Sequence, residues 1–166
     1  RVGEQHVAAA GGGRHLRLRD RGGLEPDDAA IEEAEMTAAA GGRDVLLAYP
    51  AVGPAAGRLA ELVRCFPQTR FHAVADSDRG SIDLAAAAAA RGVTIDVLVD
   101  LDVGMHRTGV TAGPAAVALY RKIAATPGLT AGGLHAYDGH LHDTDRDRLR
   151  AAVAAAFAPV WAMRDD

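Results

Sequence analysis

The feature that most constrains the fold is a regular alternation of short apolar runs with longer helix-forming segments, which begins at residue 27. The apolar runs have the length and composition of buried parallel strands, and they lie at residues 44–49, 71–75, 93–101 and 132–137. Helices are expected at residues 27–40, 54–64, 76–92, 113–127 and 145–163, the last kinked or shortened by Pro159. Such repeated units predict an α/β fold whose parallel strands are joined by right-handed crossovers.

Four units of this kind are half of an eight-stranded barrel, which typically takes about 250 residues. We therefore expect a partial TIM-type (β/α) barrel over residues 27–166, with the barrel incomplete. A doubly wound open sheet is the structural alternative, although no GxGxxG sequence or Walker loop gives such a sheet a nucleotide site. Residues 1–26 follow no clear period apart from a weak alternating strand at residues 15–19, and are expected to be an irregular or atypical N-terminal segment.

Charge and cysteine content exclude several classes of function. The formal net charge is −4 and the pI about 6.0, so no electrostatic attraction to nucleic acid or to an anionic membrane is expected. No stretch approaches the roughly 20 apolar residues that a membrane span needs. The single cysteine, Cys65, excludes an internal disulfide and any multi-cysteine zinc site, and is expected to be a small packed residue rather than a nucleophile. The chain is therefore predicted to be cytoplasmic.

A first polar cluster follows the strongest predicted strand. Ligand chemistry in parallel α/β folds collects at the carboxyl ends of the strands. Asp100 and Asp102 share one face of this strand as it ends, and Gly104 lets the chain turn so that His106 and Arg107 face the mouth of the barrel. An arginine flanked by carboxylates suits an anionic oxygen or a phosphate, but a structural Arg–Asp pair that closes the loop explains the pattern equally well.

A second polar cluster follows the last predicted strand. His135 and Tyr137 share a face of that strand, and a tyrosine at a barrel mouth either stacks on a planar ligand or packs beneath a loop. We expect His135 and His140 to contact a substrate or a loop. His140, His142 and Asp143 also form a run whose alternating histidines could face one metal ion, although most His-x-His pairs are solvated.

Together the two clusters resemble a known family. Residues 99–110, VDLDVGMHRTGV, are similar to the segment (E/D)-hydrophobic-D-x-G-M-x-R-x-G of the alanine racemase-like pyridoxal-phosphate barrels of fold type III. Residues 133–140, GLHAYDGH, resemble the second signature of the D-threonine aldolase and D-serine dehydratase branch. Residues 33–35 and 45–50 match that branch in the same order. The resemblance covers the chain from about residue 30 to residue 166.

This resemblance implies a lyase that acts on small D-β-hydroxy amino acids with pyridoxal phosphate as cofactor. It also implies a divalent metal and a homodimer in full-length members. On this chain, Arg107 matches the arginine that contacts the phenolic oxygen of the cofactor, and Tyr137 matches the tyrosine beside the cofactor ring. Asp100 and Asp102 would orient that arginine without contacting the cofactor themselves.

Two departures from the family pattern concern activity. Family members hold the cofactor through a lysine in a segment like R-P-H-x-K-T-H-K, which is expected near residues 6–10, where this sequence has no lysine. The only lysine, Lys122, falls on a predicted outer helix. The sequence also ends before the strands that bind the cofactor phosphate and before the C-terminal β-domain that supplies the metal ligands. The chain as given is expected to be an inactive fragment without a catalytic lysine or a metal site.

Other functions stay open at this point. A metal-dependent barrel hydrolase would use His135, His140, His142 and Asp143. A non-enzymatic role, as a cofactor-carrying regulatory barrel or an interaction module, is a further alternative, although the missing lysine also weakens the case for cofactor carriage. The motifs do not separate an aldolase from a dehydratase.

Overall fold

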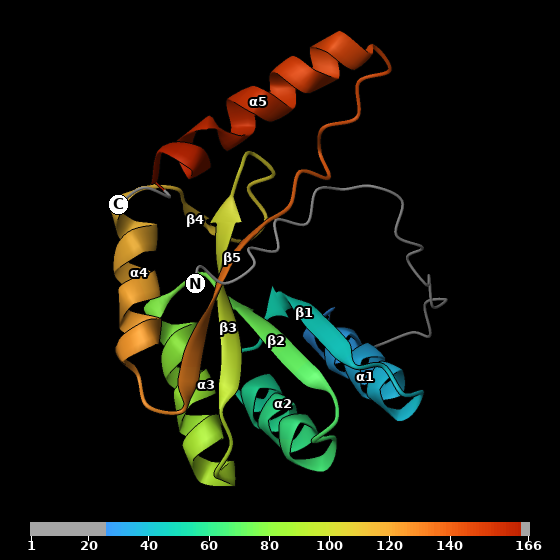
Figure 1. Cartoon of the computed structure of the whole chain (residues 1–166), viewed down its shortest axis with the longest axis vertical. Helices are drawn as coiled ribbons and strands as arrows, with labels where there is room; N and C mark the ends of the chain where they lie inside the picture. The colour runs from blue at the N-terminus through green and yellow to red at the C-terminus, as the bar shows by residue number, and fades with distance from the viewer. Residues whose placement is uncertain (1–25, 164–166) are drawn as a thin grey trace.

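The computed structural model describes residues 26–163, in which helices and strands alternate (Figure 1). The elements are α1 (Pro26–Ala39), β1 (Asp44–Pro50), α2 (Pro54–Cys65), β2 (Arg70–Ala75), α3 (Asp78–Arg91), β3 (Ile95–Asp102), β4 (Val110–Thr111), α4 (Pro114–Ala125), β5 (Leu129–Ala136) and α5 (Arg146–Met163). The predicted α/β alternation is confirmed over this range. The weak strand predicted at residues 15–19 lies outside the described residues.

The described strands form one sheet in which every pairing is parallel. β1 pairs with β2, β2 with β3, and β3 with β5, so the longer strands lie side by side in their chain order. The short β4 pairs only with the end of β3, where Leu101 and Asp102 face Val110 and Thr111. A doubly wound sheet reverses its order at a switch point. The uninterrupted order found here is that of one wall of a barrel.

The hydrophobic core lies between one face of this sheet and the helices. On β3, Ile95, Val97 and Val99 are 0% exposed, as the predicted alternation requires. They belong to one cluster of buried residues with Leu59 of α2, Leu84 of α3 and Ile123 of α4. Burial of each such side chain contributes about 1.5–3 kcal/mol, so this face holds the helices on the sheet.

The opposite face of β3 carries polar side chains, which make a network near the amino ends of the strands. His72 Nδ1 lies 2.6 Å from Asp96 Oδ2, and His72 Nε2 lies 3.1 Å from Asp44 Oδ1. The Thr130 hydroxyl donates to Asp96 Oδ1 at 2.8 Å. Gly132 leaves room for this carboxylate, because a Cβ there would lie 2.6 Å from its oxygens. The network therefore links β1, β2, β3 and β5 on the face of the sheet that does not pack against the helices.

Two features differ from the sequence expectations. β5 begins at Leu129 rather than near residue 132, because Thr, Ala and two Gly residues give its first half a weak strand signal. β4 was not predicted, since two residues cannot show a period. α5 ends at Met163, as predicted, with Pro159 inside it, and its last turn carries the buried Val160 and Met163. Beyond the carboxyl end of the sheet, α5 stands apart from the other helices (Figure 1). None of the described helices is long and apolar enough to cross a membrane.

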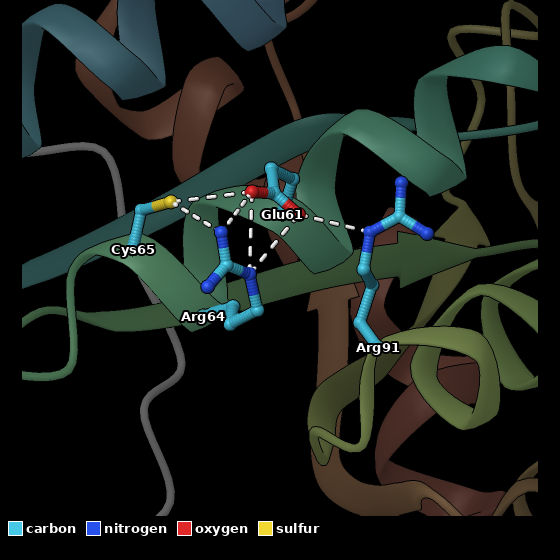
Figure 2. Close-up of polar contacts among 4 residues, drawn as sticks. All are labelled: Glu61, Arg64, Cys65 and Arg91. Atoms are coloured by element: carbon cyan, nitrogen blue, oxygen red, sulfur yellow. Dashed lines mark hydrogen bonds and ion pairs between the residues drawn. The ribbon is translucent and has the colours of Figure 1, made fainter.

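An ionic cluster joins the carboxyl ends of α2 and α3. Figure 2 shows Glu61 of α2 between Arg64 of the same helix and Arg91, the last residue of α3. Arg91 Nε donates to Glu61 Oε2 at 2.8 Å, and the Cys65 thiol donates to Glu61 Oε1 at 3.4 Å. The hydrogen bonds from Arg64 and then Arg91 lower the pKa of Glu61 to about 2.

Cys65 corrects one sequence expectation. It is exposed rather than packed, because it is the last residue of α2 and faces solvent. Its hydrogen bond to Glu61 raises the pKa of the thiol, which leaves less of the reactive thiolate at neutral pH.

We predict that Glu61→Gln makes Cys65 more reactive toward iodoacetamide at pH 8. Loss of the Glu61 charge lowers the pKa of the thiol, and the rate rises by up to about tenfold for each unit of that fall. Alkylation reports on one site, because Cys65 is the only cysteine in the sequence. Glu32→Gln, on α1 and paired with Arg58, is the matched control and should leave the rate unchanged. An equal rate in Glu61→Gln and the wild-type chain would contradict this account.

Candidate functional site

The segments that follow β3 and β5 leave the sheet at the same end (Figure 1). A shallow pocket at this end is lined by Asp100, Asp102, Arg107, His135 and Tyr137, together with Thr108 and the apolar Leu101, Val103 and Met105. The sequence predicts all five of these polar residues, and the structure brings them together. The pocket encloses about 10 Å³, roughly the space of one water molecule, and is otherwise open. The described residues thus form a shallow, open hollow at the carboxyl ends of the strands.

Arg107 is held by two aromatic rings. Its Cζ atom lies 4.7 Å from the centroid of the Tyr49 ring and 5.6 Å from that of Tyr137. Cation–π contacts of this kind keep a guanidinium in place while its N–H groups stay available to an anion. Tyr49 was not among the site residues that the sequence predicts, although it lies next to the last residue of β1. The one signal that points to it is its position near the carboxyl end of a predicted strand, where ligand residues of parallel folds collect.

Asp102 shapes the loop that carries Arg107. Its Oδ1 accepts hydrogen bonds from the backbone N–H groups of Gly104 at 2.9 Å and His106 at 3.0 Å, and its Oδ2 lies 2.6 Å from His106 Nδ1. These contacts hold His106 at φ 54°, a conformation that non-glycine residues rarely adopt. The His106 and Gly104 backbone donors, in that order, lower the pKa of Asp102 to about 2.

The far end of the same loop is held by β2. The backbone N–H of Gly109 donates to Asp76 Oδ2 at 3.2 Å, directly after that strand. Gly109 has φ +101°, and a Cβ there would lie 2.5 Å from the backbone nitrogen of Asp102. Ser77 alone caps α3, by accepting from the Gly80 N–H at 3.3 Å. Of these two neighbouring residues, Ser77 therefore caps the helix and Asp76 holds the loop.

Asp100 faces His135 across the sheet, because the two residues are paired in the register of β3 with β5. Asp100 Oδ1 lies 2.7 Å from His135 Nδ1, and Asp100 is only 3% exposed. Its second oxygen, Oδ2, is buried and makes no hydrogen bond to the described residues. Neither Asp100 nor Asp102 forms an ion pair with Arg107 in this part of the chain, so their orienting effect on Arg107 stays a prediction.

The second signature places a tyrosine and a histidine against two glycines. The Tyr137 ring lies so close to Gly139 that a Cβ at Gly139 would overlap it. The His140 ring lies against Gly104, where a Cβ would be 2.9 Å from His140 Nε2. His140 Nδ1 is buried and has no hydrogen-bond partner among the described residues. The two signatures are therefore packed directly on each other.

The residues of the metal-hydrolase alternative are not gathered into one ligand set. His135 is bound to Asp100, while Asp143 lies by α5, where it accepts from the Asp145 N–H at 2.9 Å. Within residues 26–163, no three His, Cys, Asp or Glu side chains are arranged to hold a metal ion. The described geometry gives this alternative no support.

The family is decided by comparison with known proteins. The model of the alanine racemase N-terminal domain matches residues 27–163. The chain belongs to this family. It is 36% identical to a 3-hydroxy-D-aspartate aldolase of Paracoccus denitrificans (strain Pd 1222), over 78% of this chain and 34% of that protein. It is 32% identical to a D-threonine aldolase of an Arthrobacter species, over 77% of this chain and 35% of that protein. The chain thus spans about a third of the length of these curated relatives.

Solved structures of the family agree with the fold. The crystal structure of D-threonine aldolase from Filomicrobium marinum superposes with a TM-score of 0.74 at 36% identity, over 81% of this chain and 37% of that one. Alanine racemase of Clostridium difficile 630, in complex with cycloserine, gives a TM-score of 0.52 at 12% identity, over 84% of this chain and 43% of that one. The second likeness concerns the fold alone. The parallel sheet alternating with helices is therefore part of an alanine racemase-type barrel.

We predict that Gly109→Ala destabilises the chain by at least about 1–3 kcal/mol, the usual cost of a strained positive φ, because its methyl group also meets the backbone of Asp102. Gly57→Ala is the matched control. Gly57 lies inside α2 with nothing within 4 Å of its Cβ position, so alanine should stabilise the chain by about 0.5–1 kcal/mol. Urea unfolding followed by circular dichroism measures both. Equal stability of the two variants would contradict the proposed loop packing.

We also predict that Asp102 makes stability depend on acid pH. Its folded pKa lies below the ordinary value of 3.8, so its contribution is fully present above about pH 4 and is lost as the pH falls toward 2. Asp102→Asn keeps an acceptor oxygen but has no charge to titrate. Its melting temperature should therefore fall less than that of the wild-type chain between pH 4 and pH 2. Parallel curves for the two proteins would argue against the assignment.

Proposed function

We propose that this chain supplies the cofactor-facing wall of a pyridoxal-phosphate-dependent lyase, of the aldolase type, that acts on D-β-hydroxy amino acids. The observation that carries the proposal is the position of Arg107, held between Tyr49 and Tyr137 at the carboxyl ends of the strands. The aldolases to which the chain is similar are named for D-threonine and 3-hydroxy-D-aspartate, which both carry a hydroxyl group on Cβ. These names favour an aldolase over a dehydratase.

The residues present fit pyridoxal phosphate in their chemistry. The cofactor is a planar aromatic ring with anionic oxygens, and when bound it supplies an electron sink. The Arg107 guanidinium suits an anionic oxygen on that ring, and Tyr137, 41% exposed, offers an aromatic surface beside it. Asp100 Oδ2 is buried without a hydrogen-bond partner, so a donor group on a ligand would satisfy it. We assign this role to residues 27–166 as the barrel portion of such an enzyme.

A covalent link to the cofactor needs a lysine, and this sequence offers only Lys122. Lys122 lies on α4, and its Nζ is 2.7 Å from Asp78 Oδ2 of α3. It is thus paired between two helices rather than placed at the pocket. We infer that these 166 residues alone hold the cofactor without a covalent bond and catalyse no cleavage.

Equilibrium dialysis with pyridoxal phosphate tests this proposal. Arg107→Met should weaken binding by roughly tenfold or more, since a hydrogen bond to a charged group contributes about 1.5–3 kcal/mol. Arg70→Met, at the opposite end of the sheet, is the matched control and should bind as the wild-type chain does. Lys122→Met should likewise leave the affinity unchanged. Failure of the wild-type chain to bind, or equal binding by Arg107→Met, would reject the proposed function.

A further inference from the structure

The Asp100–His135 pair differs from the histidine–carboxylate contacts of His72 on the same sheet. His72 has a carboxylate at each ring nitrogen, Asp96 at 2.6 Å and Asp44 at 3.1 Å. His135 has a carboxylate at Nδ1 only, and no hydrogen bond within the described residues involves its Nε2. Both ring nitrogens of His72 therefore have a carboxylate partner. Only one ring nitrogen of His135 has such a partner among the described residues.

The chemistry of the pair decides the state of that nitrogen. An ionised carboxylate only accepts hydrogen bonds, so Asp100 requires the proton of a neutral His135 ring to be on Nδ1. Nε2 then carries a lone pair and is the acceptor of the ring. His135 and Asp100 line the same pocket as Arg107 and Tyr137, so this acceptor is carried by a residue of the pocket wall.

The burial of Asp100 is a second, independent sign of a ligand. Its Oδ2 atom is buried and unpaired among the described residues, although Asp100 is only 3% exposed. A buried carboxylate oxygen without a donor costs free energy, because it has lost its hydration and gained no hydrogen bond in return. A purely structural pair would satisfy this oxygen, as Thr130 satisfies the second oxygen of Asp96. The unpaired atom is expected at a site that a ligand completes.

We propose that Asp100 and His135 form a proton-accepting pair in this pocket. The ligand is a small molecule that carries an anionic oxygen for Arg107 and, next to it, a hydroxyl or ammonium group. The O–H or N–H bond of that group breaks as an N–H bond forms at His135 Nε2, and the bonding electrons stay on the ligand atom. Asp100 is the positioning residue, because it fixes the ring and balances the positive charge of the protonated imidazole. Only the identity of the ligand rests on the function proposed above.

The position of the proton on His135 is the first test, by long-range ¹H–¹⁵N NMR of the full chain. We expect a protonated Nδ1 and an unprotonated Nε2 in the wild-type protein. Asp100→Asn, whose amide can donate to Nδ1, should shift the proton to Nε2. His72 is the internal control, and its signals should be the same in both proteins. A proton on Nε2 of His135 in the wild-type chain would overturn the proposal, whatever the variant does.

The availability of Nε2 is the second test, by acylation with diethyl pyrocarbonate and mass spectrometry. His135 should react faster than His72, whose ring nitrogens both face carboxylates, and Asp100→Asn should remove that advantage. A His135 that reacts no faster than His72 overturns the proposal. Pyridoxal phosphate should slow the reaction of His135 in the wild-type chain. If His135 reacts as expected but pyridoxal phosphate gives no protection, the function proposed above fails and the proton-accepting pair stands.

Discussion

The arrangement of the site depends on the parallel pairing of β3 with its neighbours. That register sets His72 of β2 opposite Asp96, and His135 of β5 opposite Asp100. Because side chains alternate along a strand, the same pairing gives one face to the apolar core and the other to these polar contacts. A slip of one residue would place Asp96 and Asp100 in the core, against the aliphatic side chains of the helices. The hydrophobic effect that holds α2, α3 and α4 to the sheet thus also fixes the chemistry of the opposite face.

The two ends of that polar face differ in how completely their polar atoms are paired. At the amino ends of the strands, the His72 network satisfies its described polar atoms, and Gly132 makes room for it. At the carboxyl ends, Arg107 rests on aromatic rings and Asp100 keeps an unpaired oxygen. Parallel α/β folds commonly separate stability from ligand chemistry in this way. The contrast is visible within a single strand, since β3 contributes a carboxylate to each end.

Much of the fold was predictable from the sequence, because buried parallel strands and amphipathic helices leave different periods in it. The same patterns gave most of the site, since polar residues after a strand are unusual enough to notice. The partner of Asp100 was not predictable, because it depends on the register between β3 and β5, which no local pattern contains. Tyr49 was missed for a related reason. It reads as an ordinary strand residue until the sheet brings β1 to the same edge as the loop of Arg107.

The loop after β3 is secured through its main chain at both ends. Asp102 binds the N–H groups of Gly104 and His106, and Asp76 binds that of Gly109. None of these anchors involves the side chains of Met105, Arg107 or Thr108, which line the pocket. The residues that fix the backbone of this loop are therefore different from the residues that line the pocket. A relative that kept the anchoring aspartates and Gly109 could exchange the pocket-lining side chains for others, and so take a different ligand, without rebuilding the loop.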